Sequence, residues 1–199
     1  MFYRPGRAVR AAMAAVTSVA LVTALGACSD GGSEPDRDEE TSAPQQAAPG
    51  IPTKATIGLV KGRLNRDRRK QLERRVTKTV DRWIDAAYVA GDYPRTDFSD
   101  AFATFSKDAA ALAKRDRRVM SNAKLGARLD SVTAKTRQLR IDVLAHNGTA
   151  AGVTGRFVLV LDLAGEVRRK DRIAGSLYLT YTGKKWKVFG YDVKRGTVR

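Results

Sequence analysis

The chain has 199 residues, enough for one folded domain with additional sequence. It contains 37 lysines and arginines against 21 aspartates and glutamates, a formal net charge of +16, with one histidine and one cysteine. A single cysteine excludes an internal disulfide, and a single histidine argues against a zinc or non-haem iron site, so we expect no metal and no other cofactor. The charge is uneven: residues 1–27 are basic, residues 28–55 are acidic, and residues 56–199 carry +17.

Residues 1–27 have the layout of a secretory signal peptide. Three arginines in the first ten residues precede an uncharged apolar run at residues 11–27, which ends in small side chains. This run is shorter than the roughly 20 residues that span a bilayer comfortably. The sequence therefore predicts export.

The end of this run resembles the bacterial lipobox through the tetrapeptide Leu25-Gly26-Ala27-Cys28. The resemblance implies that small residues admit a peptidase, that the Cys28 sulfur receives a diacylglycerol, and that Cys28 becomes the first residue of the mature chain. It implies a protein held by its lipid at the extracytoplasmic face of the cell membrane. A plain signal peptide with a chance cysteine, or a signal-anchor helix, is the alternative.

Residues 28–55 are rich in Ser, Gly, Pro, Glu and Asp and contain a single large apolar side chain. Such a segment buries too little surface to offset the entropy of ordering it. We expect a disordered acidic tether with a mean reach of roughly 30 Å. Its negative charge would be repelled by an anionic membrane.

Helices are expected first in the domain at 56–199. Residues 55–64 fit either a short strand or a lead-in turn. Apolar residues then recur every three or four positions and predict a helix over 67–89, with Asn65 as its N-cap and Gly91 as its stop. A short helix follows around residues 98–105, and Ser106 is the expected cap of a further helix that ends near Met120.

Strands follow, because the apolar period changes from 3.6 to 2. Four are expected, at residues 136–146, 151–163, 172–181 and 185–193. Asn147-Gly148 and Thr182-Gly183-Lys184 supply turn signals between them. Residues 127–136 suggest an additional edge strand. In the last strand, Trp186 and Val188 share one face, and Phe189 and Tyr191 share the other.

This order predicts an α+β fold, with N-terminal helices packed on one face of a curved antiparallel sheet. Over residues 70–193 the layout, with "GKKWKV" followed by Tyr191-Asp192, resembles the NTF2-like (SnoaL-like, cystatin-like roll) superfamily. It is similar in arrangement to actinobacterial secreted or Mce-associated proteins with this domain. The resemblance implies a cone around an apolar pocket. A cystatin-like or other helix-on-sheet roll is the alternative.

The sequence offers no catalytic residue. It has no phosphate loop, nucleophile elbow or paired-carboxylate motif, and His146 falls at an expected hairpin tip. Asp142 and Asp162 lie out of phase with the apolar positions, so we expect them at the surface, paired with Arg140 or Arg156. The candidate pocket or ligand contacts are Tyr178, Tyr181, Tyr191 and Trp83, although Trp83, like Trp186, equally fits the core.

The predicted function combines the basic domain with the export signal. Outside the cytoplasm the available polyanions are lipid headgroups and acidic or phosphate-bearing wall polymers, and nucleic acid is not expected as a partner. We expect an exported, membrane-anchored, non-enzymatic binding or scaffolding module, which could also partner an envelope protein. The alternatives are a SnoaL-like isomerase or cyclase, a polyanion-binding envelope protein, and a merely solvated basic surface.

Overall fold

The computed structural model describes residues 50–198. The expected signal peptide, Cys28 and most of the expected tether lie outside these residues. In chain order the elements are β1 (Lys54–Lys61), α1 (Arg66–Ile84), the π-helix η1 (Asp85–Val89), the 3-10 helix η2 (Ser99–Phe102), α2 (Lys107–Arg115), α3 (Arg117–Met120), the 3-10 helix η3 (Gly126–Arg128), β2 (Leu129–His146), β3 (Thr149–Gly165), β4 (Arg169–Thr182) and β5 (Lys185–Val198).

The five strands form one sheet in the order β1-β2-β3-β4-β5. The α+β class is therefore confirmed, but the expectation of helices before a wholly antiparallel sheet needs correction. β1 precedes α1 and pairs with β2 in parallel, whereas the other neighbours are antiparallel. The register of β1 shifts between Ile57 and Val60, and this irregularity interrupts the alternation that would have marked the segment as a strand.

α1 is the helix that the apolar spacing predicted. Asn65 caps it, accepting a hydrogen bond at 2.8 Å from the Arg68 backbone N–H. The turns continue from α1 into η1, so the expected range of 67–89 matches the two elements together. Gly91 follows with φ +92, the left-handed conformation that glycine adopts most easily after a helix. None of the helices within residues 50–198 is long and apolar enough to cross a bilayer.

The other sequence-predicted elements differ in two places. Ser106 does cap a helix, but the helix expected to reach Met120 is divided at Asp116 into α2 and α3. The separate edge strand expected at 127–136 is wrong, because these residues continue directly into the next strand as β2. Register shifts between Ala134 and Thr136 break the period within β2, which explains why the sequence suggested two strands.

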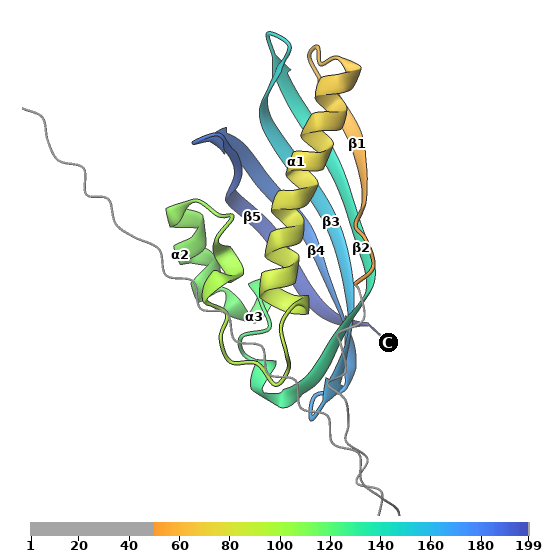
Figure 1. The fold of residues 1–199 in the computed structure, drawn as a ribbon, viewed down its shortest axis with the longest axis vertical. Coiled ribbons are helices and arrows are strands. Elements are labelled where there is room, and N and C mark those ends of the chain that lie inside the picture. Colours follow the sequence, from red (N-terminus) through yellow and green to blue (C-terminus); the bar gives the residue numbers. More distant parts are fainter. Residues whose placement is uncertain (1–49, 199) are drawn as a thin grey trace, which may run out of the picture. The chain divides into compact units, whose positions relative to one another are not determined.

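The core lies between α1 and the sheet, which curves around the helix (Figure 1). Trp83 of α1 is fully buried at its centre. Its ring packs edge-on against Phe157 of β3 at 5.2 Å and against Tyr88 of η1 at 5.6 Å between centroids, and lies 6.0 Å from Phe105. Edge-to-face aromatic packing of this kind fills space tightly. The protein's own aromatic side chains thus occupy this part of the interior.

A basic cleft as the candidate functional site

An open cleft of about 720 Å³ lies beside this core, between α1, the η2 region and the hairpin that joins β4 to β5. We call it the basic cleft. Its lining residues are Arg75, Lys78, Thr79, Arg82, Ala86, Asp100, Ala101, Ala103, Thr104, Tyr181, Lys184, Lys185, Trp186 and Lys187.

Six cations from two distant parts of the chain meet at the basic cleft. α1 supplies Arg75, Lys78 and Arg82, and the hairpin supplies Lys184, Lys185 and Lys187. Residues three and four positions apart share one helix face, which is why the three α1 cations point the same way. None of the six forms an ion pair with another described residue, and the one acid in the lining is Asp100. Their positive fields add in the cleft and favour an anionic ligand.

The hairpin turn determines where its lysines lie. Gly183 has φ +57 and Lys184 has φ +63. Positive φ at both central residues is the signature of a tight two-residue turn whose twist matches that of the strands. The turn therefore projects Lys184 and Lys185 together from the end of the sheet.

Aromatic and hydroxyl groups complete the lining. Tyr181 and Trp186 are cross-strand partners with ring centroids 5.5 Å apart; Trp186 is buried, whereas Tyr181 is exposed. The Thr104 hydroxyl is buried and has no hydrogen-bond partner among the described residues. A buried hydroxyl without a partner is costly, so Thr104 offers the cleft an unused hydrogen-bonding group.

Other basic side chains serve the fold. Arg137 of β2 is buried, and its guanidinium donates to Asp85 at 2.7 Å and to Asp81 at 2.9 Å, which ties the sheet to α1 and η1. Arg195 of β5 is paired in the same way with the buried Asp171. These two arginines are enclosed and paired with carboxylates, unlike the six cations of the basic cleft.

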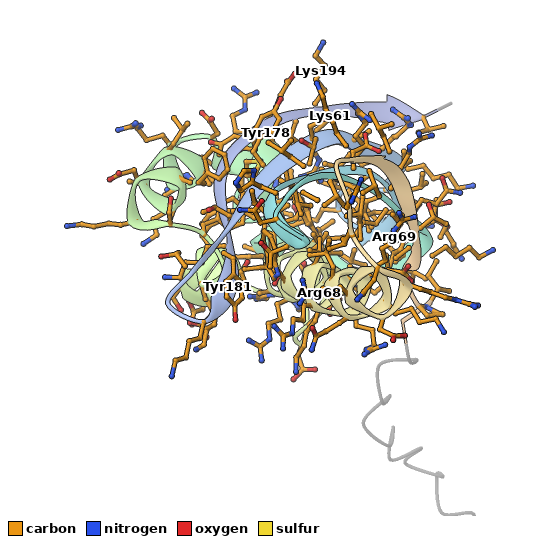
Figure 2. The ribbon with its side chains drawn as sticks, turned by 90° about the horizontal axis from the view of Figure 1, so that it is seen from above. Lys61, Arg68, Arg69, Tyr178, Tyr181 and Lys194 are labelled. Carbon is orange, nitrogen blue, oxygen red and sulfur yellow. The ribbon has the colours of Figure 1, made fainter. Side chains whose placement is uncertain are left out.

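The four candidate pocket residues do not gather in one site. Tyr181 lines the basic cleft, and Trp83 lies in the core, where its Nε1 donates to the Met120 carbonyl at 3.3 Å. Tyr178 is exposed on the opposite face of the sheet, away from α1 (Figure 2). Tyr191 donates its hydroxyl to Asp116 at 2.7 Å; partial burial and this carboxylate raise the pKa of the Tyr191 phenol.

One part of the prediction for the last strand is wrong. Phe189 was expected to share a face with Tyr191, but Tyr191 packs inward, 6.3 Å from Phe105 between ring centroids, while Phe189 is exposed. The β4–β5 register shifts between Tyr178 and Leu179, which inserts one extra residue into β5. A bulge of this kind reverses the face of every later side chain.

The remaining acid–base candidates are paired or exposed. His146 is exposed beside the Asn147-Gly148 turn, as expected. Asp142 pairs with both Arg140 and Arg156, as expected, but its side chain is largely covered, with 13% exposed. Asp162 pairs instead with Lys135 at 3.5 Å and Lys170 at 4.0 Å. Within residues 50–198 no group of three His, Cys, Asp or Glu side chains is arranged to hold a metal ion.

The sequence analysis did not predict the basic cleft. The basic face of the first helix and the Lys184–Lys187 cluster can both be recognised in the sequence, but nothing there indicates that they line the same cleft. Comparison with protein-family models gives no match, and comparison with curated protein sequences gives none either.

Proposed function

We propose that this chain is an exported lipoprotein, anchored through Cys28 at the outer face of the cytoplasmic membrane, and that its domain is a non-enzymatic binding module. The lipobox-like tetrapeptide and the basic, apolar leader before it support the anchor. The arrangement of a helix across a curved sheet of long strands supports a place near the NTF2-like superfamily.

The basic cleft is the proposed ligand site. The observation that carries this proposal is the convergence of six cations without ion-pair partners on a cleft of about 720 Å³. Lysine and arginine groups of this kind suit phosphate or carboxylate groups, whose oxygens accept charge-assisted hydrogen bonds. The ligand class is therefore a phosphate-bearing or acidic polymer of the cell envelope, which the cleft would grip while the lipid holds the protein to the membrane.

Charge reversal within the cleft tests the ligand site. The probe is inorganic polyphosphate, titrated into the full chain carrying Cys28→Ser so that no acyl chain contributes. The variant Lys184→Glu/Lys185→Glu should weaken binding by about tenfold or more, because it converts attraction into repulsion at the site. Lys114→Glu/Arg115→Glu makes the same charge change on the exposed surface of α2, outside the cleft lining, and should weaken binding less.

Equal losses in the two variants would show that polyphosphate binding depends on total charge and that the cleft is not its site.

The anchor has a separate test. The parent chain should incorporate labelled fatty acid in the cells that export it, and Cys28→Ala should abolish that incorporation. Labelling that persists in Cys28→Ala, or that is absent from the parent chain, would contradict lipidation at Cys28.

A further inference from the structure

A second surface lies on the face of the sheet opposite α1 and is apolar. Four large hydrophobic side chains there are exposed: Leu59 of β1 by 65%, Leu144 of β2 by 55%, Tyr178 of β4 by 38% and Phe189 of β5 by 55%. We call these four residues the outer strip. Only seven large hydrophobic side chains are exposed within the described residues, so more than half of them gather here. Scattered exposed hydrophobics are ordinary, but a contiguous group marks an interaction surface.

The outer strip extends from β1 to β5, with residues on four of the five strands. Gly152 of β3 is the cross-strand partner of Leu144, and Tyr178 and Phe189 stand with their ring centroids 6.4 Å apart. A Cβ at Gly152 would meet no atom within 4 Å. The glycine thus leaves an open depression of about 260 Å³, whose lining includes the four strip residues.

The local geometry of the sheet turns two of these side chains outward. Val188, the partner of Leu179, is buried, so the ordinary alternation of β5 turns Phe189 to the outer face, beside Tyr178. The register shift in β1 exposes Leu59, whose backbone N–H donates to Asp142 at 2.8 Å. The apolar strip thus combines regular alternation in β5 with an irregularity in β1.

Cations surround the outer strip. Lys61 is the cross-strand partner of Leu144 and is exposed beside it. Asp142, which also lines the depression, is neutralised by Arg140 and Arg156, whose side chains are themselves 62% and 58% exposed. Figure 2 shows Lys61, Tyr178 and Lys194 on the side of the sheet away from α1. The surroundings of the strip are thus positive.

We propose that the outer strip docks the domain onto a bilayer that contains anionic lipid, with Leu59, Leu144 and Phe189 entering the interface. Apolar side chains rimmed by lysine and arginine match a surface that offers negative headgroups above acyl chains. A second copy of the chain is the less suitable occupant, because two domains of +17 repel each other. The chain from Cys28 to Gly50 extends to at most roughly 75 Å, so a lipid at Cys28 leaves the strip free to reach the same membrane.

Vesicle binding tests this proposal without the anchor. The full chain carrying Cys28→Ser is sedimented with vesicles of phosphatidylglycerol and phosphatidylcholine. We expect binding, and we expect Leu144→Ser/Phe189→Ser to lower the partition coefficient by about tenfold or more, because two apolar side chains no longer leave water. Leu112→Ser, which removes an exposed leucine from α2 outside the strip, should leave the partition coefficient unchanged.

A fluorescent reporter keeps the test decisive if the double variant folds poorly. Trp83 and Trp186 are buried, so Phe189→Trp adds an exposed indole to the strip while retaining its apolar character. Brominated phosphatidylglycerol vesicles should quench this indole and leave the corresponding Leu112→Trp reporter unaffected. Equal quenching of the two reporters, or the absence of vesicle binding by the parent chain, would overturn the proposal.

Two further outcomes distinguish membrane docking through the strip from self-association and from binding through the hairpin lysines. Self-association in solution that disappears in Leu144→Ser/Phe189→Ser would overturn membrane docking and assign the strip to a dimer.

Lys184→Glu/Lys185→Glu tests the basic cleft independently. In one outcome, this variant no longer binds polyphosphate, but brominated vesicles still quench a Phe189→Trp reporter introduced into it; the two sites are then distinct. In the other outcome, quenching is lost as well, and the hairpin lysines, not the strip, hold the protein on the vesicles.

Discussion

Arg195 on β5 and Asp171 on β4 form an ion pair at 2.7 Å in which both side chains are enclosed, with exposures of 7% and 1%. Arg169 binds the other oxygen of Asp171, also at 2.7 Å. Arg195 additionally donates to the Ser121 carbonyl at 3.1 Å and to the Asn122 side chain at 2.8 Å. The pair therefore joins the end of the sheet to the loop after α3.

Removing one member of this pair should be strongly destabilising. Asp171→Ala leaves Arg195 buried without its counter-charge, so we expect the free energy of unfolding to fall by about 3–5 kcal/mol. Urea denaturation measures this loss. Asp162→Ala removes a carboxylate from the more exposed pair with Lys135, and it should cost about 1 kcal/mol or less. Similar losses in the two variants would contradict a special role for the buried pair.

Much of the fold could be predicted from local signals in the sequence. The Asn65 and Ser106 caps, the Asn147-Gly148 turn and the alternation of the central strands depend on neighbouring residues, and the structure confirms them. The failures in the strands share one cause. At β1, within β2 and near Phe189 of β5, a register shift adds a residue, and a pattern based on strict alternation cannot anticipate it.

The candidate site was harder to predict, because it depends on contacts between distant segments. Arg82 and Lys185 are about a hundred residues apart in the chain, yet both line the basic cleft. The total charge led us to expect an anionic partner, but it does not indicate where on the domain such a partner would bind. Conversely, buried cations such as Arg137 look the same in sequence as those of the cleft, and only their burial beside Asp81 and Asp85 separates them.

Tyr88 should make the protein sensitive to alkaline pH. Its ring is fully buried, its hydroxyl donates to the Val119 carbonyl at 2.6 Å, and burial raises its pKa far above the ordinary 10.0. An unfolded tyrosine ionises near pH 10, whereas the folded one stays protonated. The free energy of unfolding therefore falls above pH 10, by about 1.4 kcal/mol per pH unit for each such tyrosine.

Tyr88→Phe isolates this contribution. The variant loses the hydrogen bond, which lowers its stability at neutral pH by about 1 kcal/mol, but it has no phenol to ionise. Urea denaturation from pH 8 to pH 11 should therefore give a shallower loss of stability than in the parent chain. The two chains are compared by the slope of the free energy of unfolding against pH, not by its absolute value. Identical slopes would mean that the alkaline loss arises elsewhere, for example at Tyr93, whose pKa burial also raises.

Thr104 gives a test of both stability and the proposed ligand binding in the basic cleft. Because its buried hydroxyl has no partner among the described residues, Thr104→Val should raise the free energy of unfolding by about 1 kcal/mol. The same change should weaken polyphosphate binding severalfold if the hydroxyl contacts the ligand. Thr77→Val is the matched control, since the Thr77 hydroxyl is also buried without a partner but lies outside the cleft lining. Thr77→Val should stabilise the fold and leave binding unchanged; equal weakening in both variants would contradict a ligand contact at Thr104.

Gly152 offers a gain-of-function test of the outer strip. Its position is open, with no atom within 4 Å of an added Cβ, so a side chain can begin there without strain. The new side chain would fill the depression between Leu144 and Tyr178 and extend the apolar surface. We expect the partition coefficient on phosphatidylglycerol vesicles to rise by about tenfold, because one more leucine can leave water. Gly152→Ser occupies the same position without an apolar side chain and should leave vesicle binding near that of the parent chain. A rise in both variants, or in neither, would contradict docking through the strip.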